Sequence, residues 1–137
     1  MEQKKILVLD GKDMVLGRLA SYAAKQALLG KEIIVVNCNE IVITGRPRTT
    51  ILEYKDSRQR GGASLNGPFF PKYPERIVKR TIRGMLSYKQ GRGRDALKEI
   101  KCYNEIPPEF EKTEKVLIEK PKKGVRTIKL KDLSKEI

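Results

Sequence analysis

The sequence predicts an α/β fold built around a parallel sheet, and three observations predict it. Two short apolar runs, residues 6–9 and 33–36, lack the polar alternation of half-exposed strands, which is typical of strands covered on both faces. A helical pattern separates the two runs. A strand, a helix and a strand within 40 residues indicate a right-handed βαβ crossover. At 137 residues, the chain is long enough for one domain with a substantial core.

The helix between these strands is predicted over residues 16–29. Its apolar residues share one face at about 100° per residue, with Arg18 and Lys25 on the opposite face. Because alanine dominates the apolar face, the helix can lie close against a sheet. Gly30 is well suited to end it. The residues of the apolar face are Leu16, Leu19, Ala20, Ala23 and Ala27.

Further elements follow the crossover. A third apolar run at 41–43 predicts another strand, and residues 49–58 predict a helix. Residues 61–74 contain three Gly and three Pro, so they predict a loop of a length that usually has a function. The clearest helical pattern in the chain covers residues 75–89.

The pattern changes again after that helix. Residues 91–94, Gly-Arg-Gly-Arg, are predicted as a basic turn, and residues 95–99 as a short helix. Residues 100–103 predict a further strand. In the charged tail, 116–118 and 127–130 are weaker strand candidates.

Positive charge is concentrated in the middle of the chain. Of the formal net charge of +13, +10 lies between Arg46 and Arg94, where 13 Lys and Arg residues accompany three acids. This segment holds nine of the 11 Arg residues, whereas most Lys residues lie outside it. Arg binds phosphate through two parallel hydrogen bonds and stacks on bases. The high proportion of Arg in this segment therefore indicates a polyanionic partner. Nucleic acid is the first candidate and an anionic membrane the second.

The helix predicted over 75–89 carries a stripe of cations. Cations at i, i+3, i+4 and i+7 share one helical face, and apolar residues share the other. A solvated face usually alternates the sign of its charges, because like charges at i, i+4 repel by roughly a few tenths of a kcal/mol. We therefore interpret the stripe as a phosphate-binding surface, with plain solvation as the alternative. The cations are Arg76, Lys79, Arg80 and Arg83, and the apolar residues are Val78, Ile82 and Met85.

The loop at 61–74 places aromatic rings beside a cation. Unpaired bases stack on flat rings, so Phe69, Phe70 and Tyr73 next to Lys72 are candidates for base stacking. Alternatively, Phe69 and Phe70 fill the core beneath the loop.

Residues for catalysis or metal binding are few. The chain has no His and two Cys, Cys38 and Cys102, which are expected to be reduced, and neither a metal site nor a cofactor is predicted. Asp10 and Asp13 follow the first strand, where α/β folds often place active sites, but they also suit a turn and a helix start. No apolar run approaches a membrane span, so we expect an intracellular protein with no membrane partner and no small-molecule substrate.

Several ordered blocks resemble the signatures of a known family. The blocks are 15–21 (VLGRLAS), 36–39 (VNCN), 43–45 (ITG) and 82–86 (IRGML). With further landmarks at 10–11, 67–68, 101–104 and 107, the match covers about residues 5–108, and it resembles the ribosomal protein L13 family of the large ribosomal subunit. The short tail after Pro107 is similar to the archaeal branch of that family. Cys38 departs from the pattern, since many members carry Ala there.

The resemblance implies a three-layer α/β/α fold around a mainly parallel four-stranded sheet. It implies one domain over 1–108, with an extension over 109–137 packed on that domain or on RNA. It also implies no enzymatic activity, a place in the cytoplasmic ribosome beside neighbouring ribosomal proteins, binding to large-subunit rRNA and a part in early subunit assembly. Together with the charge pattern, it makes these the expected RNA-binding residues: Arg46, Arg48, Arg58, Arg60, Lys72, Arg76, Lys79, Arg80, Arg83, Lys89, Arg92 and Arg94.

Two other functions stay open at this point. One is a free regulatory RNA-binding protein, which would not travel with the large subunit in high salt. The other is a nucleic-acid-modifying or nucleotide-binding enzyme that uses Asp10 and Asp13. Replacing both by Asn would then abolish an activity without weakening RNA binding.

Overall fold

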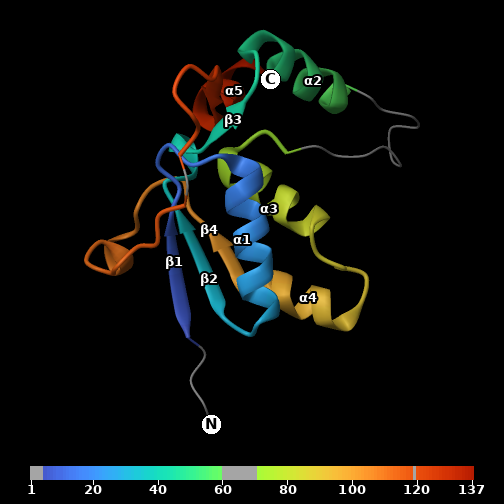
Figure 1. Ribbon diagram of the computed structural model, residues 1–137. Coiled ribbons are helices and arrows are strands. Elements are labelled where there is room, and N and C mark those ends of the chain that lie inside the picture. Colours follow the sequence, from blue (N-terminus) through green and yellow to red (C-terminus); the bar gives the residue numbers. More distant parts are fainter. Residues whose placement is uncertain (1–4, 60–70, 119) are drawn as a thin grey trace.

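The computed structural model describes residues 5–59, 71–118 and 120–137 and has a mixed α/β fold (Figure 1). Its main sheet has three parallel strands in the order β1-β2-β4. Helix α1 connects β1 to β2, which confirms the strand–helix–strand unit and the mainly parallel sheet. The elements are β1 (Ile6–Asp10), α1 (Leu16–Leu28), β2 (Glu32–Val36) and β4 (Ile100–Cys102).

The strands of the main sheet are buried on both faces, which explains why their sequences lack polar alternation. Leu9, Ile33 and Val35 belong to the principal core, which also contains the alanine face of α1. The intervening residues of the same strands form a second cluster on the opposite face. That cluster consists of Val8, Ile34 and Val36, packed against Tyr103, Ile106 and Phe110.

The two faces of the main sheet are covered differently. Helices α1, α3 (Pro74–Gly84) and α4 (Gly91–Lys98) lie on one side (Figure 1). The other side is covered by residues 103–110, which end in the 3-10 helix η2 (Pro108–Phe110). In the described part of the chain, neither a second helical layer nor a four-stranded sheet is therefore confirmed.

The expected strand at 116–118 is reduced to one bridge. Val116 lies beside Leu9 in a parallel arrangement, where the Val116 N–H donates to the Val8 carbonyl at 2.8 Å. The Asp10 N–H donates to the Val116 carbonyl at 3.2 Å. These two bonds place the segment at the free edge of β1 without extending the pairing further.

A second, two-stranded sheet lies beyond the carboxyl ends of the main strands (Figure 1). The left-handed Asn37 (φ 57°) and the 3-10 helix η1 (Cys38–Glu40) turn the chain after β2, so the strand expected at 41–43 does not join the main sheet. Instead, β3 (Val42–Thr44) pairs antiparallel with β5 (Thr127–Lys129), beside α2 (Pro47–Gln59) and α5 (Leu130–Glu136).

The helix predicted over 75–89 ends at Gly84, five residues early. Met85, expected in the core, is 46% exposed, while Ile77 is buried instead. The predicted turn at 91–94 is the first turn of α4. After α3 the chain comes so close to itself that a Cβ on Gly93 would overlap the Ser87 carbonyl group. The chain folds back on itself there and cannot continue as one straight helix.

We expect Gly93→Ala to lower the free energy of unfolding by about 1–3 kcal/mol, because the new methyl group overlaps the backbone of Ser87. Gly91→Ala, in the same turn of α4, is the matched control, because a Cβ there meets no described atom within 4 Å. Its stability should be unchanged or slightly raised. Urea denaturation of the two variants measures the difference, and equal midpoints would show that the Gly93 contact imposes no constraint.

An ion pair connects η1 to β5. The Lys129 Nζ donates to the Glu40 Oε2 at 2.7 Å, and the Lys131 Nζ lies 3.9 Å from the other carboxylate oxygen. The hydrogen bond from Lys129 holds the pKa of Glu40 below its ordinary value, and the carboxylate in turn raises the pKa of Lys129. Both shifts favour the charged pair in the folded state.

Glu40→Gln should therefore lower the melting temperature at pH 7 by no more than a few degrees, because partly exposed ion pairs contribute little. A depressed carboxyl pKa contributes stability that is present above the unfolded value and is lost as pH falls through the folded value. The difference between Glu40→Gln and wild type should accordingly shrink below about pH 4. Glu109→Gln removes the same charge outside this group of residues. Thermal melts that show the same pH dependence for both variants would contradict the assignment.

Candidate nucleic-acid interface

Helix α3 is fixed beside β4, an outer strand of the main sheet. Ile77, Val78 and Ile82 are buried in the principal core, so the cation stripe faces the other way. The backbone N–H of Glu75 donates to the Asn104 Oδ1 at 3.1 Å. In addition, the Lys79 Nζ donates to the carbonyl of Ile100 in β4 at 2.6 Å. The start and the middle of α3 are thus both tied to β4 and the residues after it.

The cation stripe forms one wall of a pocket of about 600 Å³ between α3 and β4. Lys101 of β4 adds a fifth cation, and Glu75 is the one acid among the lining residues. Both were missed from the sequence. Side chains alternate along a strand, so an apolar Ile100 facing the core indicates that Lys101 faces outward. The pocket is lined by Pro71, Glu75, Arg76, Lys79, Arg80, Arg83, Leu97, Lys101, Cys102 and Tyr103.

An arginine–tyrosine pair lies at each end of α3. The guanidinium carbon of Arg76 lies 5.9 Å from the centre of the Tyr73 ring, and that of Arg83 lies 5.2 Å from the centre of the Tyr88 ring. Cation–π attraction restrains both arginines. Tyr73 is 56% exposed and Tyr88 is 40% exposed, so each ring keeps surface on which a base can stack. Tyr88 was not among the residues expected from the sequence.

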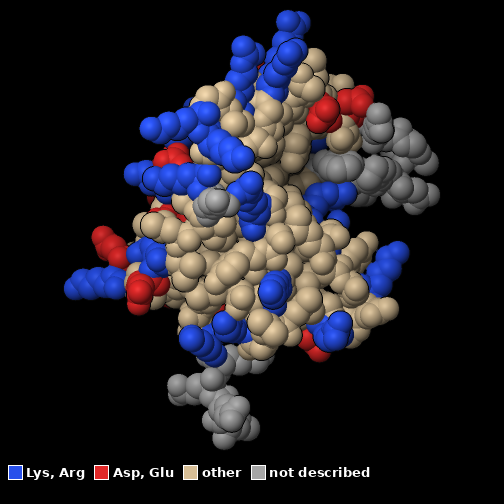
Figure 2. Space-filling view, viewed as in Figure 1, with Lys and Arg blue, Asp and Glu red and all other residues tan. Residues whose placement is uncertain are grey.

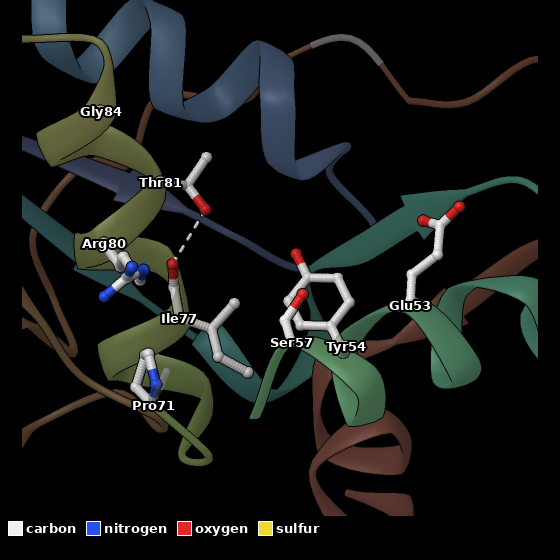
Figure 3. Close-up of a pocket in the computed structure, with 8 residues that line it drawn as sticks. All are labelled: Glu53, Tyr54, Ser57, Pro71, Ile77, Arg80, Thr81 and Gly84. Carbon is white, nitrogen blue, oxygen red and sulfur yellow. Dashed lines mark hydrogen bonds between the residues drawn. The ribbon is translucent and has the colours of Figure 1, made fainter. Parts of the chain in front are cut away.

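A second pocket, of about 340 Å³, separates α2 from α3 (Figure 3). Tyr54 and Ser57 of α2 line it opposite Ile77 of α3, and Arg80 lines both pockets. Burial, followed by the charge of Glu53, raises the pKa of Tyr54 above its ordinary value. The Thr81 hydroxyl donates to the Ile77 carbonyl at 2.9 Å.

The remaining expected cations among the described residues are exposed but do not line the pocket between α3 and β4. They lie in separate groups on the surface, and side chains of Lys and Arg are spread over the face in Figure 2, with smaller acidic groups between them. One bond links two of them, from the Arg94 Nη2 to the Lys89 carbonyl at 3.4 Å. Arg60, Phe69 and Phe70 lie outside the described residues. The exposed residues are Arg46 and Arg48 at the start of α2, Arg58 at its end, Lys72 before α3, and Lys89, Arg92 and Arg94 at the start of α4.

The family model described as ribosomal protein L13 matches residues 4–109. The chain belongs to the ribosomal protein L13 family. It is similar to three archaeal proteins named large ribosomal subunit protein uL13. The protein of Methanosarcina barkeri is 51% identical over 81% of this chain and 79% of its own length. That of Archaeoglobus fulgidus is 42% identical over 93% and 85%, and that of Methanococcoides burtonii is 46% identical over 82% and 80%.

Cys38, the departure from the family pattern noted in the sequence, is a buried core residue beside the half-buried Cys102. Hydrogen bonding to the Cys102 side chain, followed by burial, raises the pKa of Cys38 far above its ordinary value. The protonated Sγ lies 3.9 Å from the Val35 carbonyl. Both cysteines are free thiols, as expected, and Cys38 packs as a small apolar side chain.

The two aspartates of the enzyme hypothesis lie in the turn between β1 and α1. The Asp10 Oδ1 accepts hydrogen bonds from the Lys12 N–H at 3.0 Å and from the Asn37 Nδ2 at 2.9 Å. Asp13 has a left-handed conformation (φ 59°), and its N–H donates to the Glu40 carbonyl at 3.1 Å. The carboxylate of Asp10 and the backbone of Asp13 thus help to shape the turn between β1 and α1.

Neither a metal-binding cluster nor a membrane-spanning helix is present in the described ranges. No group of three or more His, Cys, Asp or Glu residues there is arranged to hold a metal ion. None of the helices in those ranges combines the length and the apolar character needed to cross a membrane.

Proposed function

We propose that this protein is a structural constituent of the large ribosomal subunit and acts by binding large-subunit rRNA, without enzymatic activity. The family carries the ribosomal assignment, and the named relatives belong to the large subunit. The observation that supports the RNA contact is the alignment of four cations on the outward face of α3, joined by Lys101 of β4. In this role the protein works in the cytoplasmic ribosome, beside neighbouring ribosomal proteins.

The separation of the cations into groups suits a protein that holds several RNA segments. Phosphate contacts position a protein on RNA, and each group has room for a different stretch of backbone. Holding converging segments together would help the subunit to fold, which supports a role in early assembly. The proposed contacts are Arg46, Arg48, Arg58, Arg60, Lys72, Arg76, Lys79, Arg80, Arg83, Lys89, Arg92 and Arg94, with base stacking at Tyr73, Phe69 and Phe70.

We also propose that the segment around Val116 becomes the fourth strand of the sheet in the RNA-bound protein. Its two backbone bonds to β1 support this register. With this strand added, the proposed fold has three layers around a four-stranded sheet. Residues 109–137 form an extension of the domain at 1–108, packed on it through Ile128, Leu130 and Leu133.

Replacing Arg76 and Arg83 together by Gln should weaken binding to isolated large-subunit rRNA. If each contacts one phosphate, the slope of log K against log salt should become shallower by about 1.4–1.8. Filter binding at several salt concentrations measures this slope. Lys122→Gln with Lys123→Gln is the control, because it removes two exposed charges from the tail. Equal slopes for all three proteins would remove α3 from the RNA contact.

A free regulatory RNA-binding protein is the second candidate, because a basic surface alone does not specify a ribosomal site. Sedimentation in high salt separates the two functions. A ribosomal constituent stays with the large subunit under these conditions, whereas a free regulator is found at the top of the gradient. Release of this protein from washed subunits would therefore favour the regulator.

A further inference from the structure

We propose that Cys38 and Cys102 are a site of oxidative modification, where a peroxide entering the pocket between α3 and β4 joins them in an intramolecular disulfide. The two thiols take no part in the proposed RNA contact, so the site is separate from that function. The inference is carried by their places in the fold. One thiol is buried in the core, and the other lies where the core meets an open pocket.

Backbone hydrogen bonds place the two cysteines side by side. Cys102 pairs with Val35 in the parallel ladder between β4 and β2. The Tyr103 N–H donates to the Val35 carbonyl at 2.8 Å, and the Cys38 N–H donates to the Tyr103 carbonyl at 3.1 Å. The start of η1 is therefore held directly beside the end of β4, although the two segments are far apart in the sequence.

The side chains of the two cysteines meet in the same part of the core. Cys38 is completely buried, and the half-buried Cys102 packs against the cluster that contains it. The two thiols are close enough for a hydrogen bond, which is the largest cause of the raised pKa of Cys38, followed by burial. A disulfide requires Cβ atoms about 3.5–4.5 Å apart. Residues whose backbones are already bonded to a common neighbour need little movement to reach that distance.

Of the two thiols, Cys102 is the one that an oxidant can reach. It lines the pocket of about 600 Å³ between α3 and β4, and hydrogen peroxide is small enough to enter a space of that size. Cys38 has no exposed surface, and its raised pKa keeps the thiol protonated. Because the thiolate is the form that attacks a peroxide, the first oxidation takes place at Cys102.

The disulfide forms in two steps. The Cys102 thiolate attacks one oxygen of hydrogen peroxide, and the O–O bond breaks. With the proton that the thiol gave up, the products are a sulfenic acid on Cys102 and one water molecule. The Cys38 sulfur then attacks the sulfenic sulfur, the S–O bond breaks, and the departing hydroxide takes the Cys38 proton to form a second water. Two thiols are thereby oxidised and one peroxide is reduced.

The first step also prepares the second. The contact with the Cys102 thiol is the largest of the causes that keep Cys38 protonated, and oxidation of Cys102 removes that thiol. Cys38 then ionises more easily beside the sulfur that it attacks. A disulfide between η1 and β4 closes a long loop, so it should restrict the unfolded chain and stabilise the fold.

Bound RNA should protect the site. Cys102 shares its pocket with the cations of α3 that are proposed to bind RNA, so a strand lying on those cations would cover the thiol. This consequence, unlike the disulfide itself, rests on the proposed function. It confines the modification to protein that has not yet bound RNA.

Treating the full-length protein with hydrogen peroxide tests the disulfide. Mass spectrometry of the intact protein should show the loss of two hydrogen atoms without added oxygen. Digestion without a reductant should release one pair of peptides joined through Cys38 and Cys102, and dithiothreitol should separate them. The oxidised protein should melt at least about 5 °C above the reduced protein, because the unfolded chain is cross-linked.

Two variants serve as matched controls. Cys38→Ala keeps the accessible thiol, so it should collect a sulfenic acid on Cys102, trapped by dimedone, and no joined peptides. Cys102→Ala keeps the buried thiol and should remain reduced under the same treatment. Circular dichroism compares the folding of both variants with that of wild type.

Oxygen adducts on Cys102 of the wild type at the level seen in Cys38→Ala, with no joined peptides, would overturn the proposal. Dimers linked through two copies of Cys102 would overturn it as well. With isolated large-subunit rRNA bound, the joined peptides should form several-fold more slowly, and an unchanged rate would contradict protection by RNA. A protein that forms the disulfide but binds no rRNA would instead refute the proposed function, so the two failures are distinguishable.

Discussion

The attachment of α3 to β4 is the constraint on which the rest of the surface depends. One side of this helix must enter the core through Ile77, Val78 and Ile82, so its cations are forced to the other side. Lys79 reinforces the arrangement, because its ammonium group is bonded to the Ile100 carbonyl. Small residues on α1 contribute as well, since the alanine face of that helix allows close packing in the same core. The position of the basic stripe is thus decided by apolar packing, not by the charges themselves.

The cations of α3 do not all act in the same way. Lys79 is partly committed to the fold, and one of its three donors is used by a backbone carbonyl. Arg76 and Arg83 lie over tyrosine rings, so their guanidinium groups lose less conformational freedom when a phosphate binds. Several cations this close repel one another in the free protein, and a bound polyanion relieves that repulsion. Binding should therefore stabilise the fold as well as the complex.

Local patterns in the sequence predicted most of the elements, and long-range packing explains the failures. The strands at 6–9 and 33–36 and the helix α1 were evident because their side chains repeat with the period of the element. The end of α3 was not evident, since the chain turns back after it and brings Gly93 against Ser87, a contact that no local pattern indicates. Likewise, the pairing of β3 with β5 joins segments more than 80 residues apart, and no local signal specifies it.

The candidate site was predictable only in its charge. Helical periodicity correctly aligned the four cations of α3, but a pocket needs a second wall, and that wall comes from β4. The place of Lys101 and Glu75 in this pocket is therefore not evident from the helical pattern alone. Tyr88 was overlooked because it follows the helix, in turns that only tertiary packing defines. A single sequence therefore indicates the sign of the partner's charge more readily than the shape of the pocket that binds the partner.

The tail after residue 108 contributes to the core and to the second sheet. Ile128, Leu130 and Leu133 lie in the principal core, and the backbone of β5 satisfies the exposed edge of β3. The Leu130 N–H also donates to the Ile41 carbonyl at 2.8 Å. Without these residues, β3 would present unpaired backbone groups and apolar side chains such as Val42 to water. The tail therefore holds the start of α2, and with it Arg46 and Arg48, in a fixed relation to the main sheet.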